Sequence, residues 1–186
     1  MAEHVCPVWM GYLLANPLRR LVQNPDTILA PYIREGMTCL DAGCAMGFFS
    51  LPMARLTGPS GTVVCVDFQQ KMLDALKRRA GRAGLLDRIT TRCCTRESLC
   101  LDGLQDTVDF ALTMAVIHEV PDPAFFFTEL WETLKPGGRL LAAEPAYHIR
   151  RARFAEEVDL ARNAGFTVLE YPAVAKSHAV LLEKQA

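Results

Sequence analysis

The sequence predicts an α/β protein built on one doubly wound, mostly parallel β-sheet. Five short strand-like runs alternate with helical stretches, and this rhythm is typical of parallel sheets with crossover helices. These runs are apolar over most of their length, as expected of strands that are buried on both faces. The last two runs, 166–170 and 178–184, are joined by a connection too short for a parallel crossover, so they should be antiparallel.

Size and composition narrow the class of protein. The chain has 186 residues, which predicts a single domain spanning 1–186. Apolar residues make up 51% and charged residues 22%, values that exclude an intrinsically disordered chain. The formal net charge is −1, so no general attraction to nucleic acid or acidic membranes is expected. No run approaches 18 apolar residues, and we therefore expect no membrane partner.

Residues 1–35 are expected to form an N-terminal helical cap of two or three short helices. Two Asn-Pro pairs, at 16–17 and 24–25, are typical helix starts, with Asn as the N-cap and Pro at the first helical position. The stretch 5–15 is apolar, but it follows Glu3 rather than a cationic region. It therefore resembles a buried or amphipathic segment more than a signal peptide.

The first half of the sheet begins after Gly36, which breaks the helical pattern of the cap. In the first helix of this half, Pro52 is tolerated because it lies near the first turn. The second helix has one apolar face, with Met72, Leu73 and Leu76 at helical spacing, and Gly84 ends it. The predicted order is strand 37–41, helix 47–57, strand 62–67, helix 69–83 and strand 88–93.

The second half of the sheet repeats the alternation. Residues 135–138 (KPGG) indicate a turn before the fifth strand, and Gly165 ends the last helix. The predicted order is strand 107–115, helix 122–134, strand 139–144, helix 151–164, strand 166–170 and strand 178–184. Ligands of such sheets bind at the carboxyl ends of the strands, so the loops at those ends carry the functional argument.

The loop after the first strand, DAGCAMGF at 41–48, has small residues at 43, 45 and 47. Small residues let the backbone turn sharply and approach a ligand closely. The next strand ends in Asp67, and an acidic residue about 20 positions past such a loop can accept both ribose hydroxyls. Together the two features predict a site for a nucleoside cofactor.

Two other nucleotide classes fit this loop poorly. A dinucleotide fingerprint, G-x-G-x-x-G/A, would place Phe48 at its third glycine, where a large ring would force the helix away from the strand. An NAD(P)-dependent dehydrogenase is therefore disfavoured. No G-K-[ST] sequence occurs, so a Walker-type phosphate loop is absent.

Four motifs carry a resemblance to a known family: CLDAGCAMGFFS (39–50), VVCVDFQQKML (63–73), VDFALTMAVIHEVPD (108–122) and LKPGGRLLAAEP (134–145). In this order and spacing the sequence resembles the class I S-adenosylmethionine (SAM) dependent methyltransferases. The likeness is to the small-molecule branch that includes the ubiquinone/menaquinone-biosynthesis and arsenite methyltransferases. It implies a Rossmann-like, doubly wound sheet of seven strands in the order 3-2-1-4-5-7-6, with strand 7 antiparallel and helices on both faces.

The resemblance also implies SAM as cofactor and a set of residues to bind it. Phe68 and Met72 are expected to pack on the adenine. Two positions depart from the common pattern. Ala45 stands where many members have Gly, with its methyl toward the methionine end. The loop after the third strand lacks the adenine-binding Asp of many members, and Thr95 or a backbone carbonyl is expected to serve instead. The implied cofactor residues are Asp41, Gly43, Cys44, Ala45, Gly47, Asp67, Phe68, Met72, Cys94, Thr95 and Met114.

The methyl acceptor is expected beside the ends of the fourth and fifth strands. Methyl transfer from a sulfonium is mainly a matter of positioning, and a base is needed only if the acceptor must lose a proton. Glu144, His148 and His118 are the candidate catalytic residues there. Packing or backbone bonding is the alternative role for His118, and an exposed loop histidine is the alternative for His148. We expect the apolar segment with Trp9, Met10 and Tyr12 to close over the site as a lid.

Other functional readings stay open. A catalytically silent SAM-binding module is the main alternative, because Ala45 alters the cofactor loop. The adjacent Cys93 and Cys94 allow an arsenite methyltransferase, since paired thiolates bind soft metalloids. No cysteine spacing indicates a zinc site, and no metal is expected. The identity of the small-molecule acceptor and its reacting atom stays open.

Cysteine usage suggests the redox compartment. The seven cysteines are an odd number, and several lie in buried strand-like runs, as Cys39 and Cys65 do. This favours reduced thiols and a cytoplasmic protein over a disulfide framework. We expect a monomer or a homodimer.

Overall fold

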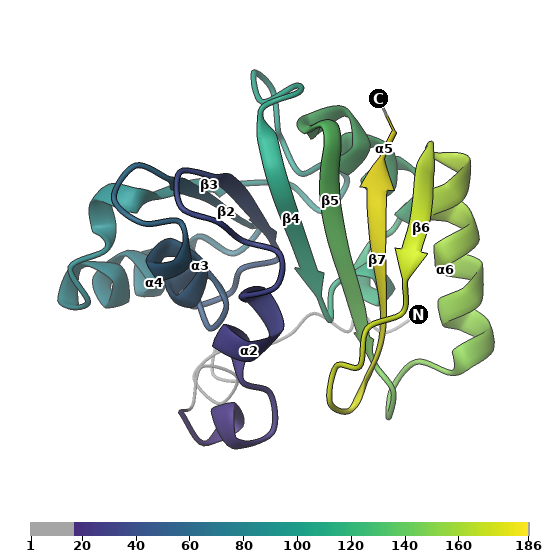
Figure 1. The fold of residues 1–186 in the computed structure, drawn as a ribbon, viewed down its shortest axis with the longest axis horizontal. Helices are drawn as coiled ribbons and strands as arrows, with labels where there is room; N and C mark the ends of the chain where they lie inside the picture. Colours follow the sequence, from purple (N-terminus) through teal and green to yellow (C-terminus); the bar gives the residue numbers. More distant parts are fainter. Residues whose placement is uncertain (1–16, 186) are drawn as a thin grey trace.

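A computed structural model describes residues 17–185, and its seven strands form one sheet (Figure 1). The strand order is β3-β2-β1-β4-β5-β7-β6, with β7 antiparallel to both of its neighbours and the paired strands from β3 to β5 parallel. The predicted order and the antiparallel last strand are therefore confirmed. The strands are β1 Thr38–Ala42, β2 Thr62–Asp67, β3 Ile89–Cys93, β4 Val108–Met114, β5 Leu134–Pro145, β6 Phe166–Glu170 and β7 Ser177–Lys184.

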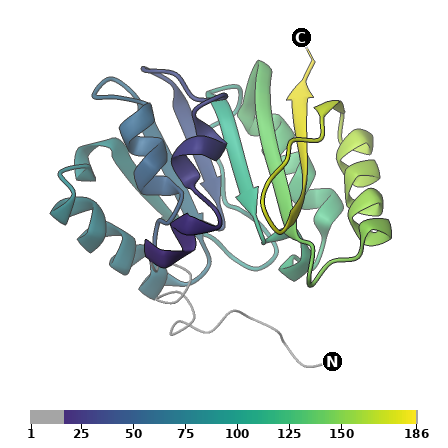
Figure 2. The ribbon, with the colours of Figure 1, turned by 60° about the horizontal axis from the view of Figure 1, so that its bottom comes forward.

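Helices cover both faces of the sheet, and strand alternation assigns the core side chains to one face or the other. Cys39 and Cys65 point toward one helical layer, whereas Leu40 and Val66 point toward the other. Figure 2 shows the two layers flanking the sheet. The first layer contains α2 Pro25–Leu29, α3 Ser50–Leu56 and α4 Gln70–Arg82; the second contains α5 Pro123–Thr133 and α6 Arg151–Asn163. Short 3-10 turns occur at η1 Pro17–Leu21, η2 Leu86–Arg88 and η3 Ile117–Glu119.

The described part of the N-terminal segment forms η1 and α2. The Asn24 side chain accepts a hydrogen bond from the Asp26 amide at 3.1 Å, and Pro25 occupies the first helical turn, as predicted. The Tyr32 ring, just after α2, stacks on Phe110 of β4 with ring centroids 5.7 Å apart. These contacts fix the segment against the face of the sheet that carries α3 and α4.

Two boundaries differ from the prediction. The KPGG segment is not a turn before the fifth strand, because β5 runs from Leu134 and shifts register against β4 between Val108 and Phe110. At Gly138 a Cβ would lie only 3.0 Å from the Val108 carbonyl oxygen, so glycine permits this irregular pairing. The first helix starts at Ser50 rather than at 47, because Gly47 has φ +80° and cannot join a right-handed helix.

Two chemical expectations concern the described residues. The cysteines from Cys39 to Cys100 are all free thiols. Among the helices of residues 17–185, none combines the length and apolar character that crossing a membrane requires.

Candidate functional site

The loop after β1 needs glycine at two positions for packing. Gly43 has φ +84°, and a Cβ there would lie 2.2 Å from a methyl carbon of Val116 in the loop after β4. Gly47 has φ +80°, and a Cβ there would lie 2.2 Å from the Leu76 side chain of α4. The loops after β1 and β4 are thus in close contact, and the small residues at 43 and 47 permit it.

Ala45 lies between those glycines and also has a positive φ, +44°. An alanine in this left-handed region costs roughly 1–2 kcal/mol more than glycine. Its methyl packs against a small cluster of Met46, Met72 and Ala75. The loop therefore keeps its tight conformation without a glycine at position 45. The Ala45 amide still donates a hydrogen bond, to the side chain of Asp67.

Asp67, the last residue of β2, holds the loop in place. Its Oδ2 accepts from the Ala45 amide at 2.9 Å, and its Oδ1 accepts from the Gln69 amide at 2.8 Å. Burial raises the pKa of this carboxyl, and the two amide hydrogen bonds oppose that rise. Each oxygen keeps a second lone pair, so the group can also accept ribose hydroxyls.

Two other predicted loop residues are buried beneath the loop. Asp41 is 3% exposed and accepts a hydrogen bond from the Ser50 hydroxyl, which ties β1 to the start of α3. Burial raises the pKa of Asp41 to about 7, against the effect of the Ser50 hydrogen bond. Burial and the neighbouring Cys65 also raise the pKa of the Cys44 thiol. A buried neutral thiol is a packing group, so any cofactor contact at position 44 is through the backbone.

A cavity opens beside Asp67, between the loops after β2, β3 and β4. It combines apolar walls with polar groups at its edge, which suits a purine ring. Of the predicted residues, Phe68, Cys94 and Thr95 line it. Burial raises the pKa of Cys94 to about 12, so this thiol is a neutral part of the wall. The remaining lining residues, which are not among the predicted cofactor residues, are Arg96, Glu97, Ser98, Leu99, Val116, Glu119, Val120, Phe126 and Glu129.

The loop after β3 is held by Glu129 of α5. Its carboxylate accepts from the Ser98 hydroxyl at 2.6 Å and from the Leu99 amide at 2.9 Å. The Thr95 hydroxyl accepts from the Ser98 amide at 3.1 Å, which closes the turn within the same loop. Thr95 therefore shapes the cavity wall as well as facing the cavity.

Met72 and Met114 lie outside the lining of this cavity. Met72 is 1% exposed and packs with Met46 and Ala75, behind the loop after β1. Met114, at the end of β4, packs against the cluster of Ala143, Val174 and Ala179. Both side chains support the walls around the site in this structure, and their contact with a cofactor stays a prediction.

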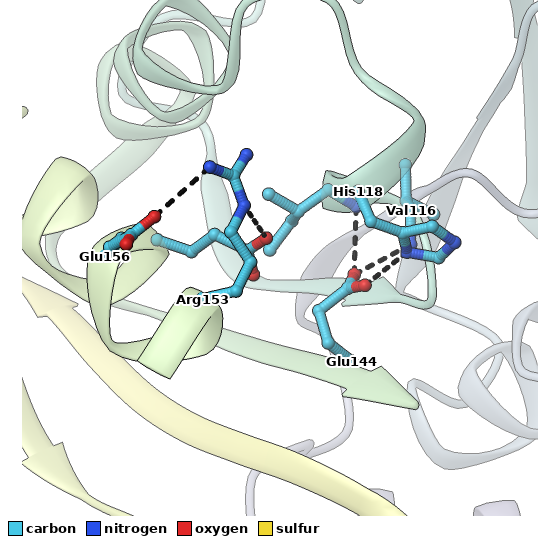
Figure 3. A network of polar contacts seen from close by, with 7 residues as sticks. Val116, His118, Glu144, Arg153 and Glu156 are labelled. Atoms are coloured by element: carbon cyan, nitrogen blue, oxygen red, sulfur yellow. Dashed lines mark hydrogen bonds and ion pairs between the residues drawn. The ribbon is translucent and has the colours of Figure 1, made fainter. Parts of the chain in front are cut away.

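The three candidate catalytic residues form one cluster at the ends of β4 and β5, and Figure 3 shows two of them, His118 and Glu144. Glu144 is completely buried and its Oε1 accepts from the amides of Val116 and Ile117, each at 2.9 Å. Its Oε2 pairs with Nδ1 of His118. The ring of His148 packs edge-on against the His118 ring, with centroids 4.9 Å apart. The three candidates thus lie together as predicted, and their catalytic roles stay a prediction. Glu144 is buried behind His118 rather than in the open site.

The cluster favours a defined state of the His118 imidazole. Burial lowers its pKa, but the hydrogen bond and charge of Glu144 outweigh burial, and Glu119 and Glu157 add to the effect, so the net pKa is raised. An ionised carboxylate only accepts hydrogen bonds, so Nδ1 carries the proton bonded to Glu144. Nε2, 3.9 Å from an oxygen of Glu119, which lines the cavity, is then left as the basic nitrogen of the ring.

The N-terminal segment reaches the same edge of the sheet. The Arg19 guanidinium lies over the Phe48 ring, 4.5 Å from its centroid, and bonds the Gln23 side chain at 2.9 Å. Phe48 directly follows the loop after β1. The predicted lid residues Trp9, Met10 and Tyr12 lie outside the described residues, so the lid stays a prediction.

The described residues, 17–185, contain no group of three or more His, Cys, Asp or Glu side chains arranged to hold a metal ion. The neighbouring Cys93 and Cys94 also differ in environment, since Cys93 is exposed and Cys94 is half-buried.

The sequence of this chain is similar to those of known proteins. A family model described as a methyltransferase domain matches residues 33–177. A ubiquinone biosynthesis O-methyltransferase of Caulobacter vibrioides is 39% identical over 137 residues, which cover 74% of this chain and 51% of the relative. The corresponding enzyme of Methylocella silvestris is 34% identical over 139 residues, covering 74% and 52%. The chain thus spans about half the length of these relatives.

Solved structures show the same fold. A SAM-dependent methyltransferase from Aquifex aeolicus superposes with a TM-score of 0.85 at 23% identity, covering 96% of this chain and 98% of that one.

Proposed function

Since the chain belongs to the methyltransferase-domain family of class I SAM-dependent methyltransferases, we propose that it methylates a hydroxyl oxygen of a small phenolic molecule with His118 as general base. The observation that carries this proposal is the His118–Glu144 pair, anchored by two backbone amides at the carboxyl edge of the sheet. The O-methyltransferase names of the relatives support an oxygen acceptor.

The residues present fit SAM. Asp67 has lone pairs for the ribose hydroxyls, Phe68 and Cys94 line a cavity suited to adenine, and the loop from Gly43 to Gly47 allows close approach of the backbone. Bound SAM supplies a methyl group on a sulfonium, a good leaving group. The protein is then left to orient the acceptor and to remove its proton.

His118 suits the second task. Its Nε2 accepts the hydroxyl proton as the oxygen becomes nucleophilic, and Glu144 stabilises the imidazolium that forms. General-base catalysis is most effective when the pKa values of base and acid are close. A phenol, with a pKa of about 10 like the tyrosine side chain, matches a histidine of raised pKa better than an aliphatic alcohol does.

The test is a methyl-transfer assay with SAM and a panel of mono- and dihydroxybenzenes. S-adenosylhomocysteine (SAH) formation is measured for the wild type and for His118→Asn. We expect turnover that rises with pH as His118 loses its proton, and a loss of roughly 10²–10⁴-fold in His118→Asn with SAM affinity unchanged. SAM binding without turnover of any acceptor would instead support a silent binding module. Turnover that His118→Asn leaves intact would exclude His118 as the base.

A further inference from the structure

Glu157 of α6 is a buried acid that the reaction described above does not use. It is 1% exposed, and among the described residues neither of its carboxylate oxygens has a hydrogen-bond partner. Its ion pair is with Nε of Arg153, 3.5 Å away, on a side chain that is 51% exposed. A buried carboxylate without hydrogen bonds is costly for a fold. Such a group calls for a functional explanation.

The surroundings of Glu157 connect it to the candidate base. Helix α6 packs on the face of the sheet into which Glu144 projects, and Figure 3 shows Arg153 of α6 in the same close-up as Glu144 and His118, with no dashed line between the two groups. The charges of both Glu144 and His118 act on Glu157, and the charge of Glu157 acts on His118. The buried region therefore holds two carboxylates and one imidazole.

Other ionisable groups face this region from each neighbouring element. The turn η3 contributes Glu119 beside His118, and α6 contributes Arg153 beside Glu157. The loop after β5 contributes His148, whose ring touches His118. From β7, the His178 ring lies 5.6 Å from the Phe154 ring of α6. Arg153 is the one permanently cationic side chain in this set, and it is mostly directed to solvent.

We propose that Glu157 is a positioning residue that acts through His118, supplying a second buried negative charge that stabilises the imidazolium when the acceptor proton arrives. The inference rests on the proposed role of His118 as base. In that step the acceptor O–H bond breaks and an Nε2–H bond forms, with the electron pair left on the oxygen. Glu144 orients the ring by direct contact, and Glu157 acts on its charge through space.

The titration behaviour of Glu157 is consistent with this role. Burial and then the charge of Glu144 raise its pKa, Arg153 and His118 lower it, and the net pKa is raised to about 7. A protonated His118 thus favours ionised Glu157, and an ionised Glu157 favours protonated His118. The protonation of each group therefore depends on that of the other.

The experiment is an NMR titration of the histidine ring protons in the full chain, which contains four histidines. The His118 signal is assigned by its loss in His118→Asn. Glu157→Gln should lower the pKa of His118 by about 1, because an amide of the same shape removes the charge. Glu156→Gln is the matched control, since Glu156 pairs with the same Arg153 but is 66% exposed. This control should leave the pKa of His118 unchanged.

The pH profile of methyl transfer provides the second readout. In Glu157→Gln the acidic limb of the kcat/KM profile should move to lower pH together with the His118 pKa. If Glu157→Gln does not fold, Glu157→Asp is the second variant, since its side chain is one methylene shorter and moves the charge away from His118. The pKa of His118 should then lie between those expected for the wild type and for Glu157→Gln. An unchanged His118 pKa in a folded Glu157 variant would overturn this inference and leave the proposed base intact. A lowered pKa with an unmoved rate profile would overturn the role of His118 as base.

Discussion

Replacing Glu144 with Gln tests the central feature of the site, because it removes one charge and keeps the shape. The Gln amide oxygen can still accept from the amides of Val116 and Ile117, which Glu144 now bonds at 2.9 Å each. The Gln NH₂ group then faces Nδ1 of His118 as a donor. Nδ1 must therefore become an acceptor, and the ring proton moves to Nε2.

This change of tautomer removes the basic nitrogen from the acceptor side. Full loss of general-base catalysis corresponds to roughly 10²–10⁴-fold in kcat, or about 3–5 kcal/mol of activation free energy. SAM affinity should not change, because Glu144 does not line the cofactor cavity. Glu144→Ala would differ, since it leaves two buried amides and an imidazole without their acceptor. It should lower the free energy of unfolding by roughly 3–6 kcal/mol.

The assay is steady-state methyl transfer to a phenolic acceptor, with SAH binding measured by calorimetry. The matched series is Glu144→Gln, His118→Asn and the double variant. If the two residues act as a unit, the double variant should be no slower than the slower single variant. Additive losses, or a Glu144→Gln enzyme with normal kcat, would refute the reasoning.

Three further predictions concern the loop after β1. Asp67→Ala should weaken SAH binding at least tenfold by calorimetry, because each lost charge-assisted hydrogen bond contributes about 1.5–3 kcal/mol; unchanged affinity in a folded variant would contradict the ribose contact. Gly43→Ala should lower the free energy of unfolding by about 1–3 kcal/mol in urea titrations, since its Cβ would lie 2.2 Å from Val116 at a positive φ; wild-type stability would argue against this close contact. The pKa of Asp41 is raised to about 7, so its protonated form favours folding, and stability should fall as the pH rises from about 4 through 7. Asp41→Asn should flatten that fall, and an unaltered pH dependence would show that Asp41 is not its source.

The fold was predictable because its signals are local. The alternation of apolar runs located all seven strands, and the Asn24-Pro25 pair located the start of α2. The prediction of a turn at the KPGG segment was wrong because Gly and Pro occur both where a chain reverses and where a strand has a bulge. Only the pairing of β4 with β5 decides between the two.

The proximity of the candidate catalytic residues was predictable from the sequence, but their burial was not. Adjacent strand ends placed Glu144 and His118 together, yet only the three-dimensional packing shows which of them is buried. Glu157 gave no signal at all. It stands next to Glu156, the same residue type on the same helix, and the two side chains are 1% and 66% exposed. That difference depends on how α6 rests on the sheet, which a single sequence does not specify.

Three loops at the carboxyl edge of the sheet are each held by hydrogen bonds from their backbone amides to an acidic side chain. Asp67 fastens the loop after β1, Glu129 the loop after β3, and Glu144 the loop after β4. Loops held in this way by hydrogen bonds within the protein lose little conformational freedom when a ligand binds. The ordering of these loops should then contribute little to the free energy of cofactor binding. A cofactor fragment such as adenosine should bind at its own part of the site.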